Sequence, residues 1–244
     1  MKTIYETTGA AKEYCDYAVD IYENCPHKCA YCYAKAKVEK SNKAFKFNGM
    51  RVGILEETKK YLEGHKFLSE KMIFLGFSSD ACPVDKDITG TIGMIKLLKS
   101  FNCKVMICTK GRLTEDVKVA ISLVDSVGIS ISCGEEMASI YETGAATVEE
   151  RKELLKYAKT CGKETWISFE PVLEAKYIYD LLNSDFMKYV DVCKFGKLNH
   201  MEISDLTKNE TDNIDWAEYA HNVIEICNNR GIAYKIKYAL SKFL

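Results

Sequence analysis

The sequence contains little proline and no linker. Only three prolines occur in 244 residues, and no stretch rich in glycine, serine and proline separates one part of the chain from another. Such stretches usually mark the boundaries between domains. We therefore expect a single domain over residues 1–244, in which 201–244 form a C-terminal extension of helix and strand. A hydrophobic content of 47% is sufficient for a sizeable core at this length.

The chain also has no excess of charge and no long apolar run. The 34 lysines and arginines face 35 aspartates and glutamates, and this formal net charge of −1 disfavours a dedicated nucleic-acid-binding protein. A basic patch can still exist within a neutral total. No apolar run reaches the length of a membrane span, and the first residues lack the apolar region of an export signal. We expect a cytoplasmic protein without membrane association, whose 11 cysteines are thiols.

Apolar runs rich in valine, isoleucine, phenylalanine and tyrosine alternate with stretches of helical spacing. The alternation predicts an α/β fold of parallel strands joined by right-handed crossovers, with ligands at the carboxyl ends of the strands. Six strands are predicted at 17–23, 72–78, 104–109, 127–132, 165–170 and 190–195. Helices are predicted at 88–101, 114–124, 147–161, 175–183 and 213–230. Segment 232–238 is either a last strand or an edge segment.

The segment 35–46 contains five lysines and one acidic residue, Glu39. Such a run can bind phosphate groups, but a charge run is more often the solvated face of a helix. We predict a solvated helix face here.

Three cysteines lie within eight residues, in the stretch IYENCPHKCAYCYA at 21–34. Cys25, Cys29 and Cys32 follow the first predicted strand with the spacing C-x3-C-x2-C. A loop this short brings three thiolates together, and thiolates favour zinc or iron–sulfur clusters over hard cations. A structural zinc ion needs a fourth ligand, for which His27 is the candidate. Structural zinc sites usually combine two separated ligand pairs, so we favour a cubane cluster with one open iron.

The cysteine spacing, with the aromatic Tyr31 just before the third cysteine, resembles the signature of the radical S-adenosylmethionine (SAM) superfamily. The resemblance implies a partial (β/α)6 barrel in which the three cysteines hold a [4Fe-4S] cluster. The fourth iron then binds the amino and carboxylate groups of SAM. Reduction of the cluster, by an external one-electron reductant of the flavodoxin or ferredoxin type, yields a 5′-deoxyadenosyl radical that abstracts hydrogen from a substrate. The protein positions and shields chemistry that the cofactor supplies.

The resemblance covers about residues 9–172 and is most specific to the branch that contains spore photoproduct lyase and the DNA repair photolyase-like proteins. The segments that carry it are LGFSSDACPVD at 75–85, VMICTKG at 105–111, GISIS at 128–132 and YETGAATVEER at 141–151. By this resemblance Ser79 and Asp80 lie beside the amino group of SAM, and Lys110 lies near its carboxylate. A zwitterion needs such groups, since its ammonium requires an acceptor and its carboxylate a cation. The other residues expected around the cofactor are Tyr31, Ser130, Ser132 and Arg151.

Polar residues after the last two predicted strands are candidates for contact with the substrate. Glu170 ends one strand, and Asn199 and His200 follow the next. Single polar residues in such places are often only loop caps. Glu142 lies nine residues before Arg151, so that either an ion pair between the two or a contact with SAM is expected.

The sequence departs from spore photoproduct lyase at the hydrogen donor. The lyase carries a cysteine immediately before its Thr-Ser-Asp run, where this chain has Phe77. Cys82 in the same loop is a candidate replacement donor, and a small apolar filler is the alternative reading. Tyr33, next to the third cluster cysteine, is a candidate for radical relay or for packing against the cluster. The remaining cysteines show no paired ligand spacing, so we expect them in the core and predict no second cluster.

We therefore predict a radical SAM enzyme that acts on an unidentified substrate, with a lyase, transferase or oxidoreductase subclass left open. Repair of a nucleic-acid lesion, as in the lyase, is the first alternative. It is less favoured because the donor cysteine is absent and the charge is balanced. The second alternative is a non-catalytic protein that keeps the metal loop.

Overall fold

The computed structural model describes residues 3–197 and 213–244. Eight strands form a sheet in which their spatial order follows their order in the sequence. β1 is antiparallel to β2, and every later neighbouring pair is parallel. Because no pairing joins β8 to β1 among the described residues, the sheet forms a partial barrel, as predicted. The strands are β1 (Tyr5–Glu6), β2 (Tyr17–Val19), β3 (Met72–Leu75), β4 (Lys104–Thr109), β5 (Ser126–Ser130), β6 (Glu164–Phe169), β7 (Val192–Phe195) and β8 (Ala233–Ile236).

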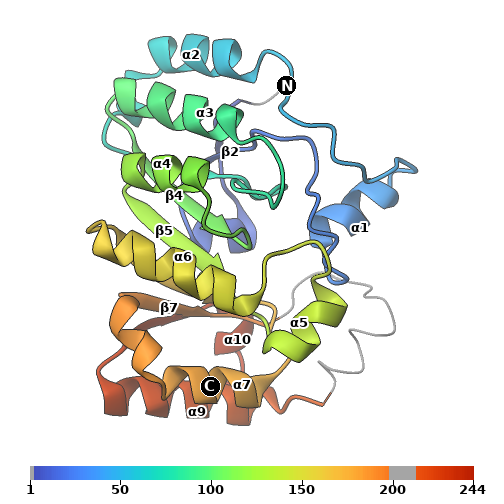
Figure 1. Cartoon of the computed structure of the whole chain (residues 1–244), viewed down its shortest axis with the longest axis vertical. Coiled ribbons are helices and arrows are strands. Elements are labelled where there is room, and N and C mark those ends of the chain that lie inside the picture. The colour runs from blue at the N-terminus through green and yellow to red at the C-terminus, as the bar shows by residue number, and fades with distance from the viewer. Residues whose placement is uncertain (1–2, 198–212) are drawn as a thin grey trace.

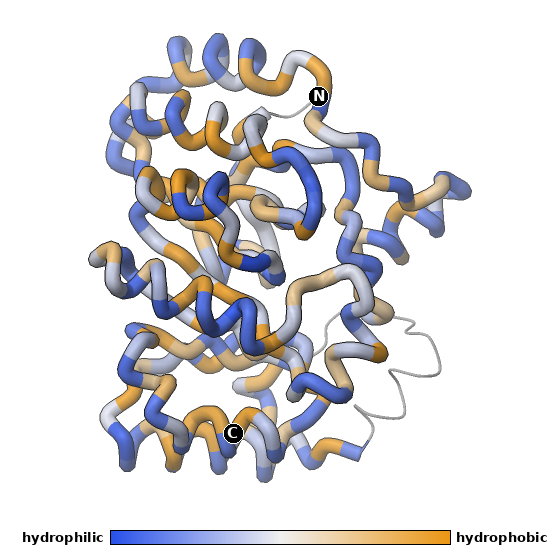
Figure 2. Tube along the Cα trace, viewed as in Figure 1, coloured by the Kyte–Doolittle hydropathy of each residue, from blue (hydrophilic) through white to orange (hydrophobic). Residues whose placement is uncertain are grey.

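Helices cover the outside of the sheet, where α2, α3, α4 and α6 stack side by side (Figure 1). In Figure 2 hydrophobic and hydrophilic positions alternate along these helices, as amphipathic helices on a sheet require. Within the described part of the chain, no helix is both long and apolar enough to cross a membrane. The α-helices are α1 (Tyr33–Glu39), α2 (Ile54–Gly64), α3 (Thr89–Ser100), α4 (Glu115–Leu123), α5 (Glu135–Tyr141), α6 (Val148–Thr160), α7 (Ala175–Leu182), α9 (Trp216–Arg230) and α10 (Tyr238–Ser241). The 3-10 helices are η1 (Gly9–Glu13), η2 (Lys66–Leu68) and η3 (Asp185–Tyr189).

Local sequence signals explain where the predicted helices begin and end. At the start of α6 the Thr147 hydroxyl accepts from the Glu150 N–H, and the Glu150 carboxylate accepts from the Thr147 N–H. α9 begins after Asp215, whose carboxylate accepts two backbone N–H groups, and ends at Gly231 in the left-handed conformation. The sequence does not predict α2 or α5. α2 buries Ile54, Thr58 and Leu62 on one face, a narrow stripe that its many charged residues obscure.

The first predicted strand, 17–23, is wrong in length, because β2 ends at Val19. Beyond this residue the carboxylate of Asp20 accepts the backbone N–H of Ser78 at 2.8 Å. Tyr22 then pairs with Met50 in an isolated bridge. The apolar residues after Val19 therefore leave the sheet and lead into the cysteine loop.

The predicted C-terminal extension contributes a strand to the main sheet. β8 lies within the segment 232–238 and pairs in parallel with β7. α9 packs against α7 and β8. The parallel part of the barrel thus runs to a seventh strand, one more than the six that the sequence predicts.

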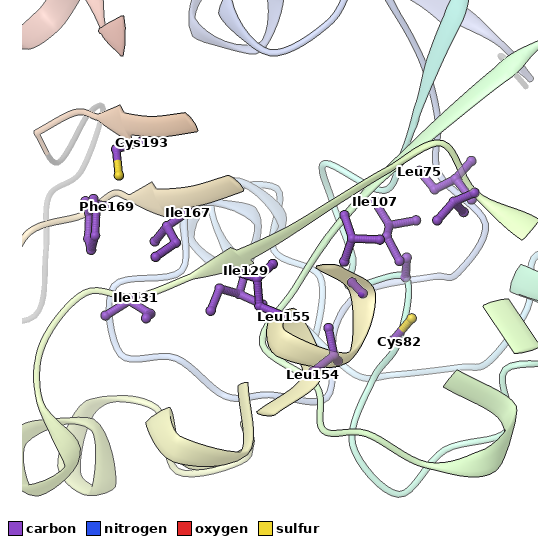
Figure 3. Close-up of a cluster of buried hydrophobic side chains, with 14 of the residues drawn as sticks. Leu75, Cys82, Ile107, Ile129, Ile131, Leu154, Leu155, Ile167, Phe169 and Cys193 are labelled. Atoms are coloured by element: carbon purple, nitrogen blue, oxygen red, sulfur yellow. The ribbon is translucent and has the colours of Figure 1, made fainter. Parts of the chain in front are cut away.

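Alternate residues of the parallel strands face two different environments. On the outer face, Leu75 pairs in register with Ile107 and Ile129 with Ile167, and these residues pack against the helices (Figure 3). On the inner face, Phe74, Met106 and Trp166 form a second buried cluster. An added Cβ at Gly128 would lie 2.3 Å from the indole of Trp166, so the glycine makes room for this ring. Because successive side chains point to opposite faces of a strand, one set packs in the core under the helices and the other set faces the barrel interior.

The lysine-rich segment 35–46 is exposed, as predicted, but only its first part is helical. α1 ends at Glu39, so Lys43 and Lys46 follow in a stretch without helix. The prediction of one continuous helix face is therefore wrong beyond residue 40, where the segment returns toward the bridge at Met50.

Candidate cofactor and active site

A cavity of about 750 Å³ lies at the carboxyl ends of the parallel strands. The cluster loop forms one side of it, and the turns after β3 and β4 continue the wall. Parallel strands direct their carboxyl ends to one edge of a sheet, which is why residues far apart in the sequence meet here. The predicted site residues that line the cavity are Cys25, Cys29, Tyr31, Cys32, Tyr33, Ser79, Asp80, Lys110, Ser130 and Glu170.

The end of α5 and the turn after it hold the cysteine loop in place through backbone hydrogen bonds. The Ala30 N–H donates to the Tyr141 carbonyl at 2.8 Å, and the Gly144 N–H donates to the His27 carbonyl at 2.9 Å. A Cβ at Gly144 would stand 2.8 Å from that same carbonyl oxygen. Only glycine allows this close approach, so Gly144 is part of the scaffold of the loop.

Both ring nitrogens of His27 already contact other residues, and these contacts help to hold the loop. Its Nε2 accepts the Val84 N–H at 3.0 Å, and its Nδ1 lies 3.5 Å from the Asp80 carboxylate. Burial lowers the pKa of His27 against the opposing effect of Asp80, so the ring is neutral with its proton on Nδ1. These contacts leave the ring without a nitrogen for a zinc ion.

The three cysteines suit a cluster better than a single ion. As the side chains stand, no group of three or more His, Cys, Asp or Glu residues within 3–197 and 213–244 could hold one metal ion. A [4Fe-4S] cluster takes each cysteine on a different iron, so its thiolates stand further apart than the ligands of one zinc ion. Burial raises the pKa of the Cys25 and Cys29 thiols to about 12. Both are therefore thiols until a soft metal replaces the proton.

Asp80 ties the cluster loop to the ends of β3 and β4. Its Oδ1 accepts the Thr109 hydroxyl at 2.6 Å and the Cys82 N–H at 2.7 Å, and its Oδ2 accepts the Lys110 N–H at 2.8 Å. With His27 on the other side, the carboxylate is held by four partners. Asp80 thus fixes the place of the residues around it.

The Ser79 hydroxyl can accept a hydrogen bond from a ligand, whereas the oxygens of the Asp80 carboxylate are already engaged. This hydroxyl lines the cavity, is buried, and has no hydrogen-bond partner in the described chain. Gly76, with a φ of +85°, makes the turn that brings it there, since a Cβ at this position would lie 2.6 Å from the Ser79 carbonyl oxygen. A buried hydroxyl without a partner is costly in a native protein, and a ligand group is a common explanation.

Lys110 projects a cation into the same cavity. Its Nζ donates to the Ser130 hydroxyl at 2.6 Å and lies 3.8 Å from Glu142. Glu142 is paired on its other side with Arg151 at 2.5 Å and accepts the hydroxyl of Tyr31. Burial raises the pKa of Glu142, but Lys110 and Arg151 outweigh it and hold the pKa below its usual value. The predicted Glu142–Arg151 ion pair is thus confirmed, and it steadies Lys110 from behind.

These groups fit a zwitterion next to a cluster. The free Ser79 oxygen suits an ammonium group, and the Lys110 ammonium suits a carboxylate. Three thiols stand on the same cavity wall.

Comparison with known proteins decides the family. The sequence model of the radical SAM superfamily matches residues 19–173, more than half of the chain. The chain belongs to the radical SAM superfamily. It is therefore an enzyme, and the cofactors of its family are a [4Fe-4S] cluster and SAM. A search of curated proteins found no match to this sequence.

Solved structures of radical SAM enzymes share the fold at low sequence identity. Spore photoproduct lyase with bound AdoMet and dinucleoside spore photoproduct has a TM-score of 0.70 at 11% identity, over 95% of this chain and 79% of that chain. SuiB of Streptococcus suis bound to SAM has a TM-score of 0.62 at 12% identity, over 90% of this chain and 50% of that chain. SuiB bound to its precursor peptide SuiA has a TM-score of 0.60. The resemblance to the spore photoproduct lyase branch is thus confirmed for the fold.

The same cavity has a second polar wall, defined here as Tyr14, Ser168, Glu170 and Lys237. The Tyr14 hydroxyl donates to Glu170 at 2.8 Å and lies 2.6 Å from the Ser168 hydroxyl. Glu170 also forms an ion pair with Lys237, which is only 2% exposed. Lys237 Nζ stands 4.2 Å above the ring of Tyr14. Of these four residues the sequence predicts only Glu170.

Aromatic residues and one further thiol line the floor between the two walls. Phe77 occupies the place of the lyase cysteine and stacks on Phe74, with ring centroids 4.2 Å apart. The Tyr33 hydroxyl donates to the Phe77 carbonyl, so Tyr33 closes the rim of the cavity. Cys108 on β4 also lines the cavity, and burial raises the pKa of its thiol to about 12. The sequence treats Cys108 as a core residue because it lies within an apolar strand.

Other predicted residues lie behind the cavity wall. Cys82 is 1% exposed within the outer core, near Ile107 in Figure 3, a placement that favours the apolar filler over a hydrogen donor. The Ser132 hydroxyl lies 2.9 Å from that of Tyr31, and Arg151 donates to the Ser130 carbonyl. Both support cavity residues from behind. Asn199 and His200 lie outside the described residues. Contacts of the site residues with SAM or substrate stay predictions.

Proposed function

We propose that this radical SAM enzyme binds SAM between the cluster loop and the ends of β3, β4 and β5, and uses it to abstract hydrogen from a substrate. The carrying observation is that the three cysteines, the unpartnered Ser79 hydroxyl and Lys110 line one cavity. These are the groups that a cluster and an amino-acid zwitterion require. The substrate and the reaction subclass are left open.

The residues of the chain divide the work between them. When bound, the cluster and SAM supply one-electron reductive cleavage and a hydrogen-abstracting group. Ser79 accepts a hydrogen bond from the SAM ammonium, and Lys110 pairs with the SAM carboxylate. Glu142 and Arg151 are positioning residues, because they act through Lys110 and Ser130. Tyr33 covers the rim and limits the access of water to the cavity.

The substrate is placed against the second wall, which Tyr14, Ser168, Glu170 and Lys237 form. Polar groups that are already fixed to one another can orient a ligand at little cost in entropy. The Phe77 ring forms the floor beneath it. In this chain no cysteine at that position supplies the final hydrogen atom.

Repair of a nucleic-acid lesion is the alternative. Its support is the likeness to a lyase structure that contains a dinucleoside photoproduct. SuiB shares the fold and has been solved with a peptide, so the fold alone does not identify the substrate.

The test is anaerobic reconstitution followed by reduction with dithionite in the presence of SAM. We expect iron and sulfide in cluster proportion, and 5′-deoxyadenosine detected by mass spectrometry. Cys29→Ala should lower 5′-deoxyadenosine formation by at least about 100-fold, since the cluster loses one of its three ligands. Cys103→Ala is the matched control, because Cys103 is buried in the core and outside the cavity.

Two outcomes would contradict the proposal. The first is a wild-type chain that takes up iron and sulfide but forms no 5′-deoxyadenosine. The second is a stoichiometric zinc ion that Cys29→Ala removes, which would support the non-catalytic metal protein.

A further inference from the structure

The positive charge of the chain is concentrated in one short segment, residues 28–46, here called the lysine segment. It contains six lysines, one acidic residue, Glu39, and no arginine. The rest of the chain has 28 basic and 34 acidic residues. The segment therefore carries a formal charge of +5 against −6 elsewhere. The balanced total conceals a strongly basic patch on an acidic protein.

All six lysines are exposed, and the segment begins inside the cluster loop. Lys28 directly precedes Cys29, and Cys32 is the N-cap of α1. The seven residues of α1 span about 10 Å, so the first lysines stand close to the cluster cysteines. Figure 1 shows α1 and the turn after it standing apart from the helices that cover the sheet. The patch is thus presented to the outside beside the cluster.

Glu39, the one acidic residue within the segment, neutralises little of this charge. Lys35 Nζ lies 4.0 Å from Glu39, and both side chains are half exposed. An exposed pair of this kind is screened by water and salt and holds neither side chain firmly. A net positive field therefore extends from the segment over roughly a Debye length, about 8 Å at physiological ionic strength.

We propose that the lysine segment is the docking surface for an acidic one-electron carrier protein, which delivers the electron to the cluster. The proposal rests on the proposed function, because a cluster held by Cys25, Cys29 and Cys32 is what receives the electron. An acidic carrier is repelled by most of this chain and attracted by the segment, so the field orients the encounter. Electron transfer becomes slower with distance, and the segment is the part of the surface that continues the cluster loop.

The patch fits a small acidic protein better than a nucleic acid. Arginine is the residue that binds phosphate through two parallel hydrogen bonds, and the segment has none. The acidic remainder of the chain would repel a long polyanion that extends beyond the segment. Encounters between electron-transfer proteins use small interfaces, and 19 residues with a seven-residue helix match that size.

The test compares two triple variants with the same change in charge. Lys35, Lys43 and Lys46 are replaced by glutamate in the first, which reverses the charge of the segment and leaves the cavity-lining Lys37 intact. The control replaces Lys71, Lys96 and Lys104, which are equally exposed. Lys71 and Lys104 lie at the amino ends of β3 and β4, at the edge of the sheet opposite to the cavity. The probe is reduced flavodoxin of acidic net charge.

We expect the second-order rate of cluster reduction by flavodoxin, followed by stopped-flow absorbance, to fall by about tenfold or more in the first variant at low salt. The control should change by less than about twofold. The difference should shrink at 0.5 M salt, because the Debye length falls from about 30 Å at 0.01 M to about 4 Å at 0.5 M. Flavodoxin affinity, measured by calorimetry, should fall in parallel. Reduction by dithionite should stay equal in both variants, which shows that the cluster is intact.

Equal losses in both variants, or a loss that salt does not affect, would overturn the docking surface. Binding of a double-stranded oligonucleotide that the first variant abolishes, with flavodoxin reduction unchanged, would overturn it in favour of a nucleic-acid surface. If dithionite reduces the cluster but no 5′-deoxyadenosine forms, the proposed function fails. The docking surface is then still tested by the measured rates of cluster reduction by flavodoxin.

Discussion

The two sides of the cavity are built from different kinds of sequence. The cofactor side takes Ser79 and Lys110 from the turns directly after two successive strands, together with the cysteine loop. The second wall takes Tyr14 from before the first parallel strand and Lys237 from after the last one. Short motifs reveal the first side, whereas only the curvature of the whole sheet creates the second.

Both sides contain a buried ion pair, yet the pairs have different surroundings. The Glu142–Arg151 pair lies behind the cavity, with both side chains 1% exposed. The Glu170–Lys237 pair lines the cavity itself. A buried ion pair therefore does not by itself identify the side of the cavity that binds the cofactor. What distinguishes the cofactor side is the unpartnered Ser79 hydroxyl beside Lys110.

The largest expected effect comes from breaking the pair behind the cofactor side. Arg151→Met leaves Glu142 buried with Lys110 as its remaining cation, and should lower the free energy of unfolding by about 3–5 kcal/mol. Guanidinium chloride denaturation measures it. Arg112→Met is the control, since its partner Asp85 is 71% exposed, and should cost under about 1 kcal/mol. Equal losses in the two variants would show that the buried ion pair contributes no more to the free energy of unfolding than the exposed one.

The corresponding change on the second wall should cost less stability and leave SAM binding intact. Glu170→Gln removes the carboxylate that faces Lys237, but the Glu170 side chain is 16% exposed, so water can partly replace it. We expect a loss of about 2 kcal/mol. SAM affinity of the reconstituted enzyme, measured by calorimetry, should change by less than about twofold. A strong loss of SAM affinity would erase the distinction between the two sides.

Lys110→Met tests the cofactor side directly, because it removes a group that we propose to bind SAM. The substitution keeps much of the apolar stem and removes the cation, so the dissociation constant of SAM should rise by about tenfold, or 1.4 kcal/mol. Lys194→Met is the matched control, because Lys194 lies on β7 over the Trp166 ring and outside the cavity lining. A tenfold rise in the control as well would mean that any loss of positive charge weakens binding.

The smallest effect concerns the pH dependence of stability. Burial lowers the pKa of Lys194 from 10.5 to about 8. Below pH 8 the side chain is charged in both states, and the native state bears the cost of the buried charge. As the pH rises from 8 toward 10.5, the native state loses its proton first and this cost disappears. Lys194→Met should therefore stabilise the protein by about 1 kcal/mol at pH 7.

Most of that advantage should be lost by pH 10. Chemical denaturation at the two pH values measures it, with Lys104→Met, an exposed lysine at the amino end of β4, as control. An advantage of equal size at both values would assign the effect to packing rather than to the charge.

The sequence by itself determined the fold class, the cysteine loop and much of the cofactor side. Residues such as Cys29, Ser79 and Lys110 follow strands at short and fixed distances, and parallel strands bring their carboxyl ends together whatever the details of packing. These features depend on local spacing, which the sequence displays directly.

Only the tertiary structure decided which polar atoms are engaged and which are open. Asp80 and Ser79 are adjacent in the sequence, yet the Asp80 carboxylate is held by four partners and the Ser79 hydroxyl by none among the described residues. Tyr14 and Lys237 meet at Glu170 although more than 200 residues separate them in the sequence. Contacts of this kind depend on the curvature of the whole sheet, because Tyr14 precedes β2 near one end of the strand order and Lys237 follows β8 at the other. Local spacing in the sequence does not show how far the sheet curves.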